Sequence, residues 1–318
     1  MIWLIGSRGM LGSEIANILT QKNIPWIGSN SEVDITDVNA LNNFADSNDT
    51  SARQTGKSVS KGTVPGKITW VINCAAYTNV DKAEEESETA MKVNAEGALN
   101  IARTTRRIGA KLIHISSDFV FGGNKNTPYT EDDIPDPVNA YGKSKASGED
   151  CVTSEITRYY IIRTGWLYGF NGKNFVYTMT SLMKNNSTVK VVNDQKGTPT
   201  NCVNLASFIY RIIETSEKAA GLFGKKSALP YGIYNFSDGG EATWYDFANE
   251  IYRLGRKHSV IENECSVNPC SSQEFETIAR RPSYSVLDKT LIQKSLGLKL
   301  PDWQDSLEQF IKDKRFNP

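Results

Sequence analysis

The stretch MIWLIGSRGMLG, residues 1–12, decides the fold of this chain. Its first five residues are apolar and predict a short buried strand. Gly6, Gly9 and Gly12 follow as a GxxGxxG pattern, which opens an amphipathic run over residues 10–21. The first glycine permits a tight turn, the second lets the backbone approach a pyrophosphate, and the third lets the helix pack on the strand. The stretch therefore predicts a dinucleotide loop at a helix N-terminus, where unpaired N–H groups bind phosphate.

Short apolar stretches and helical patterns alternate through the first half of the chain. We expect strands at residues 1–5, 25–28, 68–74, 111–116 and 159–163, and helices at residues 10–21, 37–45, 82–107 and 141–153. The third helical stretch is interrupted near Gly97, and Asp37 is placed to cap the second. Such alternation is typical of a parallel sheet with helices on both faces. The predicted fold class is therefore α/β, a Rossmann-type doubly wound parallel sheet.

The regular alternation of strand and helix patterns ends at about Gly165. Helices are expected at residues 175–184, 203–217 and 244–254, the last capped by Thr243, and strands at residues 188–193 and 232–237. The tail, residues 287–311, is expected to form short helices around Pro301. This second half predicts a smaller lobe interleaved with the end of the sheet.

These patterns divide the chain into two predicted units. Residues 1–168 form a dinucleotide-binding domain, to which residues 197–237 return. Residues 169–196 and 238–318 form a substrate-binding lobe. Residues 47–67 contain almost no large apolar side chain and are expected to be a polar insertion loop that the fold tolerates.

The composition excludes several classes of protein. Lys and Arg together number 36, as do Asp and Glu, so the formal net charge of zero argues against a general nucleic-acid binder. No apolar run approaches the roughly 20 residues that span a bilayer, and the uncharged start is too short for a signal peptide. The five scattered cysteines and only two histidines predict free thiols in a reducing cytoplasm, without a disulfide framework or a zinc site.

The choice of cofactor depends on the end of the second strand. A NAD-binding loop often has an acid there to contact the ribose 2′-hydroxyl, but this strand ends in Gly28-Ser29-Asn30. The absence of that acid, together with Arg8 in the glycine loop, favours NADPH and its 2′-phosphate. Glu32 lies close enough in sequence to contact the ribose, so NADH stays an alternative.

A second motif, Tyr141-Gly-Lys-Ser-Lys145, is typical of carbonyl reduction. On a helix its Tyr141 and Lys145 share one face. The ammonium is expected to stabilise the phenolate and lower the pKa of Tyr141, which then donates a proton to a carbonyl oxygen as hydride reaches its carbon. Ser117 stands at the end of a predicted strand, at the sheet edge that faces ligands, and can hydrogen-bond the same oxygen.

These motifs, with Asn73-Cys74-Ala75-Ala76 and Val93-Asn94, resemble those of the extended short-chain dehydrogenase/reductases. A finer pattern is similar to the dTDP-4-dehydrorhamnose reductase family at residues 75–84, 116–121, 163–168, 194–200 and 281–285. The resemblance covers nearly the whole chain, and only residues 47–67 depart strongly. It implies NAD(P)H-dependent reduction of the 4-keto group of dTDP-4-dehydro-6-deoxy-L-hexose to dTDP-L-rhamnose, a step of nucleotide-sugar biosynthesis.

The resemblance also implies roles for individual residues. Tyr141 is the expected proton donor, Lys145 its partner and cofactor ligand, and Ser117 the third catalytic residue, where the family usually has threonine. The expected cofactor-binding residues are Gly6, Arg8, Gly9, Met10, Leu11 and Gly12 at the pyrophosphate, Asp34 and Ile35 at the adenine, and Ala75, Ala76 and Tyr77 beside them. Asp118, Trp166 and Ser117 are expected to contact the sugar nucleotide. Some members use a divalent metal at a dimer contact; none of its ligands is matched here, so metal dependence stays open, and a homodimer is one arrangement that the resemblance allows.

Two alternatives to the reductase stay open from the residues. A related sugar-nucleotide epimerase or dehydratase is one, although Phe119 stands where such dehydratases have an acidic residue after Asp118. A non-catalytic dinucleotide-binding subunit, similar to the regulatory subunit of methionine adenosyltransferase, is the other. Arg280 and Arg281 either approach substrate phosphates or lie on the surface.

Overall fold

The computed structural model describes residues 1–49, 66–221 and 229–318 of the chain. Residues 50–65, the greater part of the predicted polar insertion, lie outside the described residues. The edges of that insertion are the end of helix α2 (Val38–Asn48) and the approach to strand β3 (Trp70–Asn73).

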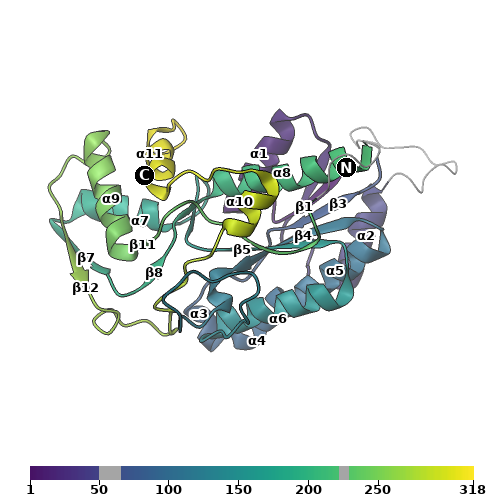
Figure 1. Cartoon of the computed structure of the whole chain (residues 1–318), viewed down its shortest axis with the longest axis horizontal. Helices are drawn as coiled ribbons and strands as arrows, with labels where there is room; N and C mark the ends of the chain where they lie inside the picture. The colour runs from purple at the N-terminus through teal and green to yellow at the C-terminus, as the bar shows by residue number, and fades with distance from the viewer. Residues whose placement is uncertain (50–65, 222–228) are drawn as a thin grey trace.

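A six-stranded parallel sheet forms the centre of the larger part of the molecule (Figure 1). Its order is β10-β5-β4-β3-β1-β2, and all five pairings are parallel. The strands are β1 (Ile2–Ile5), β2 (Trp26–Ser29), β3, β4 (Lys111–Ser117), β5 (Tyr159–Thr164) and β10 (Gly232–Asn235). Strand β10 reaches the sheet from far along the chain and pairs with β5. The predicted doubly wound parallel sheet is confirmed.

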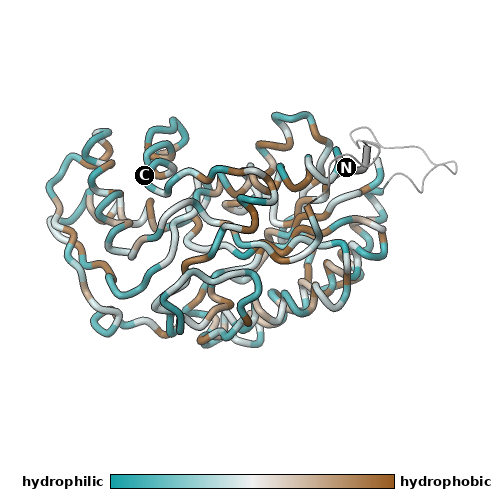
Figure 2. The backbone as a smooth tube through the Cα atoms, in the orientation of Figure 1, coloured by the Kyte–Doolittle hydropathy of each residue, from teal (hydrophilic) through white to brown (hydrophobic). Residues whose placement is uncertain are grey.

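Helices cover both faces of this sheet (Figure 1). Alternate residues of β1 point to opposite faces of the sheet. Ile2 and Leu4 pack with α1 (Met10–Gln21) and α8 (Cys202–Gly221) on one face. Trp3 and Ile5 pack with the helices that cover the opposite face. Those helices are α2, α5 (Gly97–Arg107) and α6 (Ala140–Glu155). In Figure 2 the strands are the most continuously hydrophobic part of the tube, as expected for a sheet buried on both faces.

The predicted long helix over residues 82–107 consists of four pieces. Helices α3 (Lys82–Glu85) and α4 (Ser87–Met91) are followed by a π-helical turn, Lys92–Glu96, before α5 begins at Gly97. The predicted interruption near Gly97 is therefore confirmed. A π-helical turn inside an α-helix frequently marks a functional position.

The second part of the molecule has its own hydrophobic core. Helices α7 (Phe175–Asn185), α9 (Trp244–Lys257) and α11 (Trp303–Lys312) contribute most of that core. Thr243 caps α9 in a capping box with Asp246, as predicted, and α10 (Thr290–Leu296) and α11 lie on either side of Pro301. Strand β12 (Ser266–Cys270), which pairs with β7 (Thr188–Val192), was not predicted, because its exposed, proline-containing sequence does not alternate.

A helix able to cross a membrane would have to be both long and apolar. Among the helices within residues 1–49, 66–221 and 229–318, none meets both conditions.

Candidate active site

The glycine loop forms a tightly packed cradle between β1 and α1. Gly6 has a φ of 77°, and a Cβ there would lie 2.9 Å from the backbone nitrogen of Ala75. A Cβ on Gly12 would lie 2.0 Å from the carbonyl oxygen of Gly6. Gly9 precedes α1, and in the described part of the chain no side chain caps the first N–H groups of this helix. The cradle therefore fits the pyrophosphate of a dinucleotide, as Gly6, Gly9 and Gly12 predicted.

The end of β2 is joined to this loop by an amide side chain. The side-chain oxygen of Asn30 accepts a hydrogen bond from the backbone N–H of Arg8 (2.9 Å). The Glu32 carboxylate folds back to accept from the backbone N–H of Asn30 (2.9 Å), and such backbone hydrogen bonds lower its pKa. The position after β2 is thus filled by the uncharged side chain of Asn30. The positive charge predicted to contact the cofactor in this loop is that of the exposed Arg8 side chain.

Two predicted adenine residues differ in exposure. Asp34 is exposed and its carboxylate accepts from the N–H and hydroxyl of Thr36. Ile35 is buried and packs against Gly97, where a Cβ would lie 2.9 Å from its side chain. The first residue of α5 therefore has to be small for Ile35 to occupy this position.

Asn94, which the sequence indicated only as part of a motif and without a role, links two segments of the candidate site. It lies in the π-helical turn and is buried; its side chain accepts from the N–H of Tyr77 (2.9 Å) and donates to the carbonyl of Tyr77 (3.0 Å). It also donates to the Ser144 hydroxyl (2.9 Å), which bonds the carbonyl of Tyr141 (2.7 Å). Asn94 therefore joins the predicted cofactor segment, Ala75, Ala76 and Tyr77, to the start of α6. A buried polar residue at an interrupted helix was the available signal.

The predicted catalytic residues come from β4 and α6. Ser117 ends β4 and Tyr141 stands in the first turn of α6, close enough for the Ser117 hydroxyl to influence the pKa of the phenol. Lys145 is only 2% exposed, and its Nζ donates to the carbonyl oxygen of Ile115 (2.7 Å). The structure thus brings Ser117, Tyr141 and Lys145 to the carboxyl end of the sheet.

The expected lowering of the Tyr141 pKa by Lys145 is wrong for this structure. Burial raises the pKa of Tyr141 to about 12; the nearby Ser117 hydroxyl lowers this pKa and the charge of Asp118 raises it, but both effects are smaller than that of burial. Burial also lowers the pKa of Lys145 to about 8, against the attraction of Glu149. Burial is thus the largest effect on the phenol, and the Lys145 ammonium is bonded instead to the carbonyl oxygen of Ile115. Tyr141 is therefore fully protonated near neutral pH.

Asp118 follows Ser117 and is held by residues from both parts of the chain. Its carboxylate accepts from the Ser117 hydroxyl (3.2 Å) and from the Ser285 hydroxyl (2.6 Å). Gly165 lies so close that a Cβ there would be 2.4 Å from the carboxyl carbon. Burial raises the pKa of Asp118 to about 6.

Trp166 follows the end of β5 and has an unusual backbone conformation. Its φ is 49°, and its ring stacks on Trp244 with centroids 3.5 Å apart and planes 4° from parallel. The backbone of Gly197 packs closely against the same ring: a Cβ added to Gly197 would lie 2.5 Å from the Trp166 ring. The orientation of Trp166 is therefore fixed by packing from both sides.

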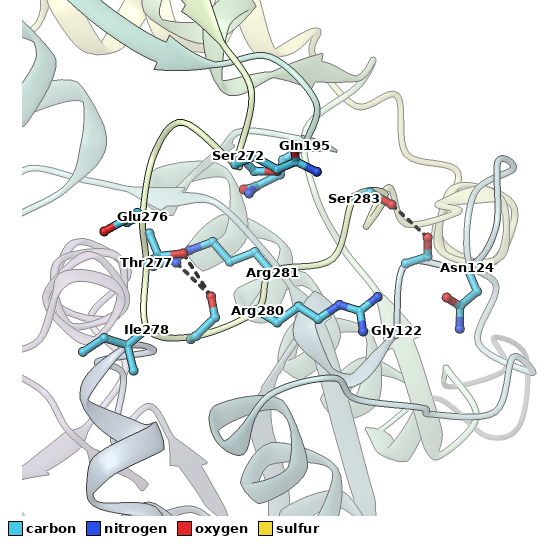
Figure 3. A pocket seen from close by; sticks show the side chains of 13 residues that line it. Gly122, Asn124, Gln195, Ser272, Glu276, Thr277, Ile278, Arg280, Arg281 and Ser283 are labelled. Carbon is cyan, nitrogen blue, oxygen red and sulfur yellow. Dashed lines mark hydrogen bonds between the residues drawn. The ribbon is translucent and has the colours of Figure 1, made fainter.

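A cavity of about 900 Å³ opens between the loop after β4 and the segment around residues 272–283 (Figure 3), and none of Ser117, Asp118, Tyr141, Lys145 and Trp166 is among its lining residues. Its lining residues are Gly122, Gly123, Asn124, Gln195, Ser272, Gln273, Glu276, Thr277, Ile278, Ala279, Arg280, Arg281 and Ser283. The Asn139 side chain caps α6 by accepting from the N–H of Gly142 and donates to the carbonyl oxygen of Arg280 (2.8 Å). The cavity therefore adjoins the helix end that carries Tyr141.

The two arginines of the cavity have different partners. Arg281 is bonded to the Asp81 carboxylate at 2.7 and 3.2 Å, and this interaction lowers the pKa of Asp81. For Arg280, no hydrogen bond or ion pair of the guanidinium is found among the described residues, and Figure 3 shows it extended along the cavity. Arg280 alone of the two is free to meet an anion.

Comparison with known proteins decides the family. Residues 1–316 match the model of the family described as RmlD substrate binding domain. The dTDP-4-dehydrorhamnose reductase of Aggregatibacter actinomycetemcomitans is 35% identical over 307 residues, which are 96% of this chain and 96% of that protein. The chain belongs to the dTDP-4-dehydrorhamnose reductase family.

Solved structures of the same family have the same fold. A dTDP-4-dehydrorhamnose reductase from Clostridium acetobutylicum is 38% identical, with a TM-score of 0.83 over 98% of each chain. The reductase from Bacillus anthracis, solved in complex with NADP, is 33% identical with the same TM-score and coverage. The resemblance inferred from the motifs is thus confirmed, and with it an NAD(P)H-dependent oxidoreductase.

Metal binding by this member of the family was left open by its sequence. Within the described ranges, no group of three or more His, Cys, Asp or Glu side chains is arranged to hold a metal ion.

Proposed function

We propose that this protein reduces the 4-keto group of dTDP-4-dehydrorhamnose with NADPH and forms dTDP-L-rhamnose. The observation that carries the proposal is the placement of Ser117, at the end of β4, beside Tyr141 and Lys145, which stand one helical turn apart on α6, next to a cavity large enough for a sugar nucleotide. NADPH oxidation in the presence of the 4-keto sugar nucleotide, with identification of the product, tests it. No turnover by the wild type would favour the non-catalytic dinucleotide-binding subunit.

The chain's own residues divide the chemistry among them. Bound NADPH supplies the hydride. Tyr141 is protonated at neutral pH and donates its phenolic proton to the oxygen of the 4-keto group. The Ser117 hydroxyl hydrogen-bonds that oxygen and stabilises the charge that develops on it. The Lys145 ammonium orients the cofactor ribose and stabilises the negative charge that forms on Tyr141 when its phenol has given up the proton.

The division of the chain is part of the same proposal. Residues 1–168 and 197–237 bind the dinucleotide, and residues 169–196 and 238–318 bind the sugar nucleotide. Asp118 and Trp166 stand where the two parts meet and contact the sugar. The protein acts in the cytoplasm, and a homodimer is its proposed assembly.

The substrate diphosphate is proposed to bind Arg280. Arg280→Ala is expected to raise KM for the sugar nucleotide about 10- to 100-fold, the cost of one charge-assisted hydrogen bond, while kcat changes little. Steady-state kinetics on the 4-keto sugar nucleotide measures this. Arg253→Ala is the control, because Arg253 is an exposed arginine that pairs with Glu250 on α9. An unchanged KM in Arg280→Ala would place the diphosphate elsewhere.

The preference for NADPH is proposed to depend on Arg8. We expect NADPH to bind at least as tightly as NADH, and Arg8→Ala to weaken NADPH about 10-fold while leaving NADH nearly unchanged, because only NADPH has a 2′-phosphate. Fluorescence titration of both cofactors measures this, with Lys22→Ala, at the other end of α1, as the control. A strong NADH preference that survives Arg8→Ala would contradict the assignment.

A further inference from the structure

A buried ion pair lies directly behind the catalytic residues. Glu149 stands one helical turn beyond Lys145 on α6, and Arg163 stands on β5. The Arg163 guanidinium donates hydrogen bonds to both carboxylate oxygens of Glu149, from Nη2 to Oε2 at 2.7 Å and from Nε to Oε1 at 3.0 Å. The two side chains are only 4% and 2% exposed. The proposed chemistry assigns no role to this pair.

The pair is connected to the strand that carries Ser117. The Ser116 hydroxyl donates to the Glu149 carboxylate, and Lys145 donates to the carbonyl oxygen of Ile115. Helix α6 is thus bonded to two successive residues of β4, immediately before Ser117. These two bonds connect the helix that carries Tyr141 to the strand that carries Ser117.

The enclosure of Arg163 makes this connection rigid. Its guanidinium lies over the Phe121 ring at 5.0 Å and donates to the carbonyl oxygen of Glu131 (3.4 Å). A buried ion pair seldom adds net stability over well-packed apolar residues, but it fixes the geometry of the groups that satisfy it. Such a pair is therefore suited to determine the position of a helix.

We propose that Glu149 is a positioning residue which, with Arg163 and Ser116, fixes the register of α6 on β4. This register keeps Lys145 and Ser117 in the relative position that the reduction needs. Glu149 itself does not touch the substrate or the cofactor.

The pair also acts on the charge of Lys145. The charged and titratable groups around this ammonium are the carboxylate of Glu149, paired with Arg163, and the thiol of Cys74; His114 stays neutral because burial lowers its pKa well below the usual range. Glu149 raises the pKa of Lys145 against the effect of burial. Loss of its charge lowers this pKa further, so the charged form of Lys145 is lost at a lower pH.

Glu149→Gln tests the positioning role. We expect kcat to fall about 10- to 100-fold, with KM for the sugar nucleotide nearly unchanged, and the alkaline limb of the pH–kcat profile to move down by about one pH unit. NMR titration of Lys145 in the same variant should show the same downward shift. An unchanged limb and an unchanged Lys145 titration would overturn the proposal.

Two further variants distinguish a positioning effect from a loss of folded protein. Ser116→Ala removes only the hydrogen bond from β4 to Glu149 on α6 and should lower kcat about threefold to tenfold. The double variant Glu149→Leu/Arg163→Met leaves no unpaired charge and should fold with a Tm near the wild type. If the folded double variant had the kcat of the wild type, the positioning role would be contradicted and the ion pair would have a structural role alone.

A matched control distinguishes the loss of any buried carboxylate from the loss of the carboxylate that positions α6. Glu14→Gln removes another buried carboxylate that an arginine, Arg315, satisfies, but on α1. It should change Tm without moving the Lys145 titration. Because the kcat measurements rest on the proposed function, a wild type without turnover would refute that function alone. The NMR titration and the Tm values would still decide the role of Glu149.

Discussion

Turnover is expected to fall by about two to four orders of magnitude in Tyr141→Phe, the usual scale for the loss of a general acid. The substitution removes only the hydroxyl. The ring keeps its edge-to-face contact with Phe119, whose centroid lies 5.9 Å away, so the start of α6 should not move. Steady-state rates on the 4-keto sugar nucleotide give the size of the loss.

Cofactor affinity distinguishes a lost proton donor from a disturbed site. NADPH binding should change little in Tyr141→Phe, since the phenol acts mainly on the substrate oxygen. Ser117→Ala serves as the comparison: it should lower turnover less, because it removes a hydrogen bond and no proton donor. Near-wild-type rates in a folded Tyr141→Phe would show that another group delivers the proton.

Lys145→Ala should reduce turnover and NADPH affinity together. Turnover should drop about 100-fold or more and cofactor affinity about 10-fold, because the ammonium supports both Tyr141 and the cofactor ribose. Lys145→Met keeps the length of the buried side chain and should give the same two losses if the charge is what matters. A loss of turnover with unchanged NADPH affinity in both variants would restrict Lys145 to the tyrosine.

The pH dependence of the wild type tests the same residue. Lys145 acts in its charged form, which predominates below its pKa, and burial places that pKa at about 8. Turnover should therefore decline as the pH rises through about 8, and the variants at position 145 should lack this limb. A wild-type profile that stays flat to pH 10 would contradict a charged Lys145.

Local patterns predicted the fold, and they indicated Ser117, Tyr141 and Lys145, which the structure brings to one edge of the sheet. The cradle follows from Gly6, Gly9 and Gly12 because glycine spacing after a strand reports a steric requirement within a few residues. Tyr141 and Lys145 follow from helical periodicity, since positions four apart share a face. The parallel sheet follows from the alternation of strand and helix patterns.

Contacts between distant parts of the chain could not be predicted in this way. Ser285 bonds Asp118 across 167 positions and Arg281 bonds Asp81 across 200, and no spacing rule links such pairs. The pKa of Tyr141 was predicted in the wrong direction because burial, which dominates it, is known only once the fold is known. The sequence also left Arg280 and Arg281 equivalent, whereas among the residues that the structure describes Arg281 has a carboxylate partner and Arg280 has none.

The position of β10 has a consequence for the synthesis of this protein. Strand β10 (Gly232–Asn235) pairs with β5 (Tyr159–Thr164), so the edge of β5 has no native neighbour until the ribosome has released residues well beyond 230. At about 5–20 residues per second, the nascent sheet waits for several seconds with an open, apolar edge. An open strand edge is a template for pairing with other chains. Chaperone demand and aggregation of truncated products should therefore concentrate on chains that end between β5 and β10.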